Sequence, residues 1–282
     1  MNLIRKLRFA SKLDIVMNLF ISFFALVSIF PIYWLIISSF KNSNDAVAIP
    51  PQWIPLHPTL NNFTDIFVNG NAGTWMFNSV SYATITVAGA VIISSMMSYA
   101  LIMLNTPFKK IITGLVVASL IMPKDVYLLP LYQLMVDINW VGTKFPFIFT
   151  DLAMPFGVFL LMVFYNAIPK EIKESATMDG CSDFRFFISF GIPLTRSGIG
   201  AFFIIAFIKE WNGFLWPFVI SQGNTDLFTL PVGVATLFED GAVVNYGLKY
   251  AGAAVSALPL LIIFFSFQRF FTQGITSGSV KG

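Results

Sequence analysis

Long apolar runs, each nearly free of charge, alternate with shorter polar segments along almost the whole chain. Runs of this length predict membrane-spanning helices, because about 20 apolar residues in a helix cross a hydrocarbon core about 30 Å thick. A transmembrane barrel would instead alternate apolar and polar residues over strands of about 10 residues. We therefore predict an all-α membrane protein with six transmembrane helices, at residues 15–40, 75–104, 111–122, 145–168, 197–221 and 250–271.

Polar residues and prolines mark three of these runs. The third run is soon followed by Pro123 and Lys124, which predict a broken or shortened helix. The fourth run contains Asp151, and the fifth contains Lys209 and Glu210. The first run is longer than the roughly 7–15 apolar residues of a signal peptide, so we expect it to remain as the first helix.

The composition agrees with a membrane protein. Hydrophobic residues make up 56% of the 282 residues and charged residues 11%, with a mean hydropathy of +0.77; soluble domains average about 45–50% apolar and about 25% charged residues. No polar stretch is long enough for a soluble domain, so we predict a single transmembrane domain over residues 1–282. The net charge of +3 is spread over short loops and predicts no nucleic-acid partner. The single cysteine, Cys181, and the lack of a Cys/His cluster predict no metal site.

The basic residues set the expected orientation, because cytoplasmic loops are enriched in lysine and arginine. If the N-terminus is cytoplasmic, 12 of the 17 lysines and arginines fall in inner segments, 4 in outer segments and Lys209 in a span. We therefore expect both termini in the cytoplasm, with cytoplasmic segments at residues 1–12, 169–193 and 273–282.

The densest charged run, residues 170–181, lies between the fourth and fifth predicted helices. Pro169 suits the start of a helix, residues 170–178 are mostly good helix formers, and Gly180 suits the position just after a helix end. A short helix over residues 170–178 is therefore expected.

A second short helix should follow it. Ser182 or Asp183 can cap a helix that runs from Phe184 toward Phe190, and Pro193 is expected to end it. Together the two helices form a bent segment, residues 169–193, which we call the elbow. A helix that projects from the membrane in this way can enter a groove in a partner protein.

The elbow resembles the EAA motif of the inner-membrane permeases of ATP-binding-cassette (ABC) importers. That motif has a Glu-Ala-Ala triplet, a Gly four residues after the last Ala, and a Pro further on. The matching residues here are Glu174, Ser175, Ala176, Asp179, Gly180 and Pro193. Ser175 departs from the usual Ala, but it is also small and compatible with a helix.

Other segments resemble the carbohydrate-uptake, maltose-type branch of these permeases. They are Pro31-Ile32-Tyr33-Trp34 with Ser39-Phe40-Lys41, then Asn78-Ser79, Ser98-Tyr99-Ala100, Trp211-Asn212, and the closing segment from Gln268 to Gly282. Together with the elbow they cover nearly the whole length of the chain.

The resemblance implies a permease subunit that moves a sugar or oligosaccharide across the cytoplasmic membrane of a prokaryote by alternating access. It implies three partners besides lipid: a second permease subunit, an extracytoplasmic sugar-binding protein, and a dimer of ATPase subunits that use ATP and Mg. This chain has no GxxxxGK[ST] phosphate loop, so it is expected to bind no cofactor and to be no enzyme. In the family the elbow lies in a cleft of the ATPase. Glu174 is then expected to contact a basic group, Ala176 to permit close approach, and Gly180 to make the turn.

The charges inside the fifth run suggest a second site. Lys209 and Glu210 lie near mid-depth of that run, where a charge costs several kcal/mol unless it is paired or faces water. One interpretation is that they line a sugar path with Trp211, Asn212 and Trp216, since sugars offer apolar ring faces to aromatic side chains and hydroxyls to amides. Adjacent residues on a helix point about 100° apart, so we do not expect Lys209 and Glu210 both to face one pore centre.

Other interpretations of these charges stay open. They could form a structural contact with a partner chain or with Asp151. They could also relay ions or protons, which would make the chain a secondary transporter that uses Asp151, Lys209 and Glu210 and needs no ATPase. A purely structural or assembly protein would use the elbow only for docking.

Overall fold

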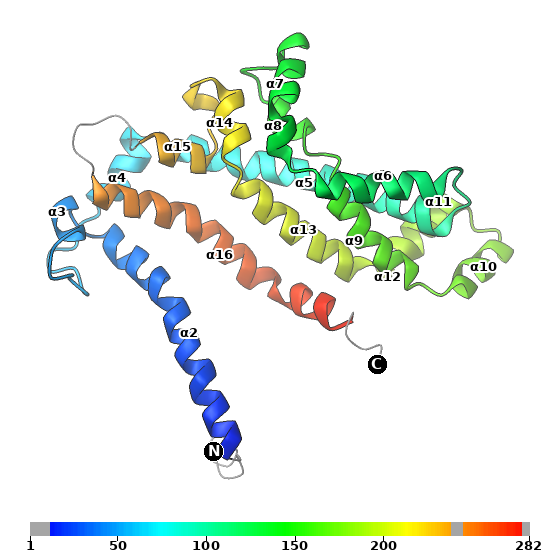
Figure 1. The fold of residues 1–282 in the computed structure, drawn as a ribbon, viewed down its shortest axis with the longest axis horizontal. Helices are drawn as coiled ribbons and strands as arrows, with labels where there is room; N and C mark the ends of the chain where they lie inside the picture. Colours follow the sequence, from blue (N-terminus) through cyan, green and yellow to red (C-terminus); the bar gives the residue numbers. More distant parts are fainter. Residues whose placement is uncertain (1–11, 238–244, 278–282) are drawn as a thin grey trace. The chain divides into compact units, whose positions relative to one another are not determined.

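The computed structural model describes residues 12–237 and 245–277, and every regular element in these ranges is helical (Figure 1). The chain forms two compact units: residues 1–70 with 237–257, and residues 71–236 with 258–282. The assignment of one membrane domain stays a prediction. The predicted cytoplasmic ends, 1–12 and 273–282, lie outside the described residues except for Lys12 and residues 273–277, which are helical.

The first unit is built on one long apolar helix, α2 (Lys12–Ser39). Large apolar side chains are exposed along most of its length, which suits a helix surrounded by lipid. The first predicted run therefore forms a helix as expected. Short elements follow it: α3 (Ser43–Ala46), α4 (Asn61–Thr64), a π-helical turn (Asp65–Asn69) and the first part of α16 (Tyr246–Ser277).

A buried lysine organises the polar end of this unit. Lys41 is 1% exposed; its Nζ donates to the backbone oxygen of Gln52 and lies 4.4 Å from the centroid of the Trp34 ring. Asn62 Nδ2 donates to the Lys41 backbone oxygen at 2.8 Å. Gly247 packs against the same group, since a Cβ there would lie 2.4 Å from the Lys41 oxygen. These contacts tie residues 41–62 to the start of α16.

The second unit is centred on α5 (Ala72–Met103). Three helices pack along it: α9 (Pro155–Asn166), α13 (Arg196–Trp211) and α15 (Leu230–Thr236) (Figure 1). The other helices of the unit are α6 (Lys109–Ile121), α7 (Leu128–Asp137), α8 (Phe145–Phe149), α10 (Lys170–Met178), α11 (Asp183–Phe186), α12 (Ile192–Leu194) and α14 (Leu215–Ser221), with the later part of α16. The second predicted run is thus confirmed as a single helix.

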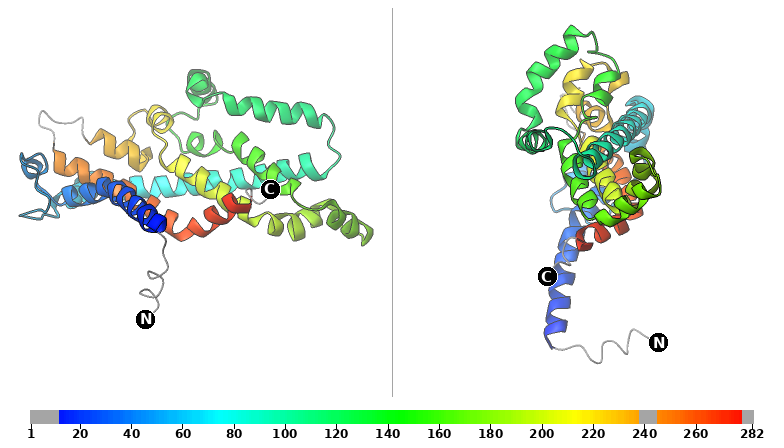
Figure 2. Two further views of the ribbon diagram at one scale, coloured as in Figure 1. Left: turned by 60° about the horizontal axis from the view of Figure 1, so that its bottom comes forward. Right: turned by 90° about the vertical axis from the view of Figure 1, so that its right-hand side faces the viewer.

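The third predicted run is broken where the sequence indicates. Helix α6 ends before Pro123, and the chain bends by 93° into a 3₁₀ turn (Lys124–Tyr127) and α7. In the left view of Figure 2, α6 runs across the picture while α7 is seen nearly end-on. The bend brings Lys124 to the corner between two helices.

The fourth and fifth runs were expected to be continuous helices, and this prediction is wrong. The fourth breaks between Phe149 and Pro155, because a proline at the first turn of α9 cannot continue a preceding helix. The fifth breaks between Trp211 and Leu215, on either side of Gly213. In the described residues, three helices are long and apolar enough to cross a membrane, or up to five if each sharply bent pair is one span. The count of six stays a prediction.

Small residues permit close helix packing in the second unit. A Cβ on Gly157 of α9 would lie 2.1 Å from Cζ of Phe202, a side chain of α13 with no exposed surface. We expect Gly157→Ala to destabilise the protein by about 1–3 kcal/mol through overpacking. Thermal unfolding of the purified transporter complex measures this as a lower Tm.

A glycine on α6 provides the matched control. Gly114 is also helical, and a Cβ there would meet nothing within 4 Å. We expect Gly114→Ala to leave Tm unchanged or slightly raised, because Ala has the higher helix propensity. Equal Tm values for the Gly157 variant and the wild type would contradict the close packing of α9 on α13.

Candidate functional site

The first half of the elbow forms the expected helix. Helix α10 runs from Lys170 to Met178 and has no buried residue. Glu174 and Ser175 are exposed on it, and Ala176 is half-buried. Among the described residues, no hydrogen bond or ion pair engages the Glu174 carboxylate. This acid is therefore available to a partner.

Gly180 ends α10 in a left-handed conformation with φ +78°. Its N–H donates to the Thr177 oxygen at 3.0 Å, and the N–H of Cys181 donates to the Ala176 oxygen at 2.9 Å. This pair of bonds is the Schellman motif, which satisfies the last carbonyls of a helix and favours glycine at the left-handed position. Gly180 therefore makes the turn after α10 that the sequence predicts, and Asp179 occupies the cap position just before it. Their part in ATPase coupling stays a prediction.

The second half of the elbow begins as expected and ends differently. Ser182 Oγ accepts a hydrogen bond from the N–H of Arg185 at 3.3 Å and caps α11. The prediction that Pro193 ends this helix is wrong: a π-helical turn (Phe187–Gly191) leads into α12, and Pro193 lies in the first turn of α12. Proline is tolerated there because the first helical N–H groups have no intrahelical acceptor. The chain instead bends by 74° just after Leu194, before α13 begins.

The elbow is fixed to the C-terminal end of α5, the end that we predict to face the cytoplasm. Lys173 Nζ donates to the Met103 oxygen at the end of α5 and lies 3.1 Å from Asp183 Oδ1. Tyr99 of α5 donates through its hydroxyl to the Asp183 oxygen at 3.0 Å. Its ring also packs against Phe187, with centroids 5.1 Å apart. Lys173 was not singled out from the sequence, and Tyr99 was named only as part of the resemblance of residues 98–100 to the carbohydrate-uptake branch. Neither contact could be predicted, because each joins segments that are distant in the sequence.

The motif residues of α10 border two different hollows on the surface. Glu174 borders a hollow of about 800 Å³ that α10 forms with the ends of α5 and α9. Ser175, Ala176 and Asp179 border another of about 420 Å³, together with Phe190. Pro193 lines neither. The exposed motif residues thus lie on different faces of one short helix.

A cluster of four charged side chains forms inside the second unit. Asp151, in the break between α8 and α9, accepts a hydrogen bond from Lys124 and lies 3.1 Å from Lys209 Nζ. Lys209 also lies 3.3 Å from Glu210 Oε1. The predicted contact between Lys209 and Asp151 is therefore present, and Lys124 joins it through the bend after α6. We call these four residues the charge cluster.

The charge cluster lines a cavity of about 310 Å³. Both Lys209 and Glu210 line it, so our expectation that they face apart is wrong for this cavity. Both side chains are long and flexible, and Glu210 is only one residue from the end of α13, where the chain turns away. Trp216 lies on the wall as well.

The other residues predicted for a sugar path lie elsewhere. Trp211 is 1% exposed and stacks with Phe207 at 6.0 Å between ring centroids. Asn212 is exposed, and its Nδ2 donates to the Ile208 oxygen at 2.9 Å. Neither lines the cavity.

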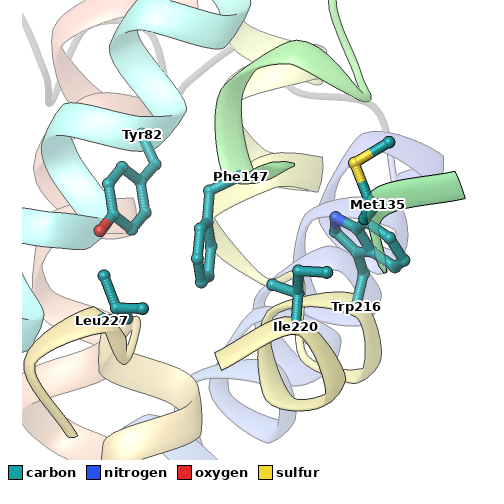
Figure 3. Close-up of a cluster of buried hydrophobic side chains, with 6 residues drawn as sticks. All are labelled: Tyr82, Met135, Phe147, Trp216, Ile220 and Leu227. Carbon is teal, nitrogen blue, oxygen red and sulfur yellow. The ribbon is translucent and has the colours of Figure 1, made fainter. Parts of the chain in front are cut away.

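Three members of a cluster of buried side chains, Tyr82, Phe147 and Trp216, line the same cavity. Tyr82 of α5 stacks on Phe147 of α8, with ring centroids 4.7 Å apart, and Figure 3 shows the two rings facing one another. The cluster continues through Trp216, Ile220, Leu227 and Met135. Sequence reasoning missed Tyr82 and Phe147, because a tyrosine or phenylalanine in an apolar run is indistinguishable from packing residues.

No group of three or more potential metal ligands is found in the part of the chain that the structure describes. The two carboxylates of the charge cluster are instead paired with lysines. The cavity offers charged groups, hydroxyls and aromatic faces, which suit a polar organic molecule.

Comparison with known proteins gives a consistent result. A model of the family described as "Binding-protein-dependent transport system inner membrane component" matches residues 91–277. The chain is 35% identical over 264 residues to the arabinooligosaccharides transport system permease protein AraQ of Halalkalibacterium halodurans, covering 93% of this chain and 94% of that protein. It is 31% identical over 271 residues to AraQ of Bacillus subtilis, covering 95% and 96%.

A solved structure shares the fold. One chain of a bacterial ABC transporter involved in the import of the acidic polysaccharide alginate matches with a TM-score of 0.81 at 18% identity, covering 93% of this chain and 99% of that chain. The all-α membrane fold and the resemblance to carbohydrate-uptake permeases are both confirmed. The relatives also favour an ABC importer subunit over an ion-coupled secondary transporter. The chain therefore belongs to the binding-protein-dependent transport system inner membrane components, multi-pass permease subunits of ABC importers that carry no ATPase site of their own.

Proposed function

We propose that this chain conducts a sugar or oligosaccharide across the cytoplasmic (inner) membrane of a prokaryote by alternating access. A second permease subunit completes the path, an extracytoplasmic binding protein delivers the sugar, and a dimer of ATPase subunits supplies the work from ATP and Mg. Both termini and the elbow then lie in the cytoplasm. The names of the AraQ relatives, which transport arabinooligosaccharides, support the class of solute.

The elbow carries the proposal that an ATPase drives this chain. Helix α10 has no buried residue, ends in a well-bonded turn and presents Glu174, whose carboxylate has no partner in the described part of the chain. Its neighbour Lys173 anchors it to the last turn of α5. A partner that moves α10 therefore moves the end of α5 with it. We assign Glu174 to contact a basic group of the ATPase, and Ser175, Ala176 and Asp179 to border the docked surface.

Helix α5 links the elbow to the cavity. Tyr99 contacts the elbow, and Tyr82 lines the cavity. The two residues are 17 positions apart on one helix, which corresponds to about 25 Å at 1.5 Å per residue. A shift of the elbow is then transmitted as a rigid-body movement of α5 relative to the cavity walls on α13 and α14.

The ATPase can drive this movement only if it binds the inward-facing and outward-facing states with different affinity. Moving a population from 1:99 to 99:1 requires a difference of about 5.5 kcal/mol between the two states. An isolated salt bridge at Glu174 supplies only a part of that difference, because exposed ion pairs contribute about 0–1 kcal/mol. The rest of this free-energy difference must come from the surface of α10 around Glu174.

Uptake into vesicles tests the proposed function. We expect vesicles carrying this chain with its partner permease, ATPase and binding protein to accumulate a neutral sugar such as arabinotriose only when ATP is present on the cytoplasmic side. Uptake should continue after an ionophore collapses the proton gradient. Uptake that follows the proton gradient and ignores ATP would support the secondary transporter, with Asp151, Lys209 and Glu210 as the relay, and would contradict the proposal.

A further inference from the structure

Two buried hydroxyls at the cavity wall lack hydrogen-bond partners. Tyr82 is 6% exposed and Thr229 is 5% exposed, and neither side-chain oxygen has a partner among the described residues. Both residues line the cavity that holds the charge cluster. Buried polar groups are nearly always hydrogen-bonded in proteins, and an unsatisfied one is costly. A polar guest in the cavity would supply the missing partners.

The remaining walls combine aromatic faces with charged groups. Trp216 and Phe147 provide aromatic surface, and Lys209 and Glu210 provide a donor and an acceptor. The Lys209 ammonium has three N–H donors and contacts two carboxylates, Asp151 and Glu210, so one donor can bond a guest. A sugar ring matches this combination: its C–H faces pack on aromatic rings, and its hydroxyls both donate and accept hydrogen bonds.

The net charge of the wall favours an uncharged guest. Lys124 and Lys209 lie opposite Asp151 and Glu210, and Asp125 adds a third acidic side chain to the lining. An anionic solute such as a phosphate ester or a uronate would therefore meet no excess of positive charge.

The size of the cavity suits a small guest such as one sugar ring. Its volume of about 310 Å³ is at the lower end of the range of about 300–1,000 Å³ for small-molecule sites. A longer oligosaccharide would extend beyond it. The cavity is therefore suited to one unit of the solute.

We infer that this cavity is a binding subsite for a single uncharged sugar ring, in which the hydroxyls of Tyr82 and Thr229 bond the sugar and Trp216 packs on its face. The inference rests on the proposed function and specifies the chemical class of the solute. Tyr82 and Thr229 are thus specificity-determining residues that bind through one hydroxyl each. The charge cluster supplies the other polar contacts.

Saturation-transfer NMR on the purified complex of both permeases and the ATPase tests the subsite, with arabinotriose as the probe and without the binding protein. This method detects weak binding directly. We expect Tyr82→Phe and Thr229→Val each to weaken binding by about 3–10-fold, the loss expected for one hydrogen bond to an uncharged group. Thr229→Ser keeps the hydroxyl and should bind the probe as the wild type does.

Ser94→Ala is the matched control. Ser94 lies on α5 with no exposed surface, and its Oγ also lacks a partner among the described residues, but it does not line the cavity. We expect this variant to bind arabinotriose with unchanged affinity. Thermal unfolding of every variant separates lost binding from lost folding, because removing an unsatisfied hydroxyl should leave Tm equal or higher.

Competition tests the charge preference. Excess neutral maltotriose should reduce the arabinotriose signal, whereas glycerol 3-phosphate at the same concentration should not. Displacement by glycerol 3-phosphate, or unchanged binding in both hydroxyl variants, would overturn the subsite. If the wild type imports arabinotriose with ATP and these results still occur, only the subsite fails; if no neutral sugar is imported at all, the proposed function fails as well.

Discussion

A chain carrying Gly180→Pro will reach the membrane at about the wild-type level and will import sugar at least about tenfold more slowly, a loss of about 1.4 kcal/mol or more in coupling. Proline fixes φ near −65°, which is incompatible with the +78° that Gly180 adopts. It also removes the N–H that donates to the Thr177 oxygen. The last turn of α10 then loses its defined end, and α10 no longer keeps a fixed direction relative to α11.

The Gly180→Pro chain should still fold and assemble with its partner subunits. A Cβ at Gly180 would meet nothing within 4 Å, and α10 contributes no buried residue to the unit. Immunoblots of membranes measure the amount of chain, and ATP-driven uptake into vesicles measures the coupling. The basal ATPase rate should persist while the response to sugar and binding protein is lost.

Two variants make the result specific to the turn of the elbow. Gly180→Asn should retain most of the uptake, because asparagine tolerates the left-handed conformation. Gly223→Pro is the matched control: Gly223 has φ +77° and equally open surroundings, but it lies in the loop after α14. We expect it to import sugar at nearly the wild-type rate. Equal loss in both proline variants would count against a coupling role for the elbow.

The elbow could be predicted in detail because its structure is determined locally. Three of its features depend only on neighbours within a few residues. They are the helix-forming residues 170–178, the left-handed conformation of Gly180 and the cap at Ser182. Pro193 was misjudged, since a proline after a helical segment either ends the helix or begins the next turn. Here the π-helical turn before Pro193 leads directly into α12, so the proline begins a helix. Nothing in the sequence marks that turn.

The cavity could be predicted only in part. Lys209 and Glu210 were recognisable because a charge in an apolar run must find a partner or water. Lys124 was recognised only as part of the break after the third run, and the 93° bend after α6 brings it to Asp151. Tyr82 is ordinary in its run, and its significance depends on what faces it from residues more than 60 positions away.

Asp151→Asn is expected to be the most destabilising single change in the charge cluster. Its carboxylate engages both lysines and its side chain is only 11% exposed. Neutralising it leaves Lys124 without its carboxylate partner and Lys209 with Glu210 alone. Removing one partner of a buried ion pair costs about 3–5 kcal/mol, and we expect the lower end because the Lys209 side chain is 58% exposed. The purified complex should show a Tm lowered by several degrees and should import sugar poorly.

A second-site variant tests whether the unpaired Lys124 ammonium causes this loss of stability. Lys124, whose side chain is 24% exposed, is the less solvated of the two lysines. Lys124→Met in the Asp151→Asn background should recover part of the lost Tm, because it removes one unpaired charge and leaves a side chain of similar length. Asp137→Asn is the control: among the residues that the structure describes, this exposed carboxylate accepts a hydrogen bond only from Gln133 in α7, and its neutralisation should leave Tm unchanged. The double variant could instead be no more stable than Asp151→Asn alone. In that case Asp151 stabilises the protein through the hydrogen bond that it accepts from Thr150 and through the geometry of the break between α8 and α9, and not through its charge.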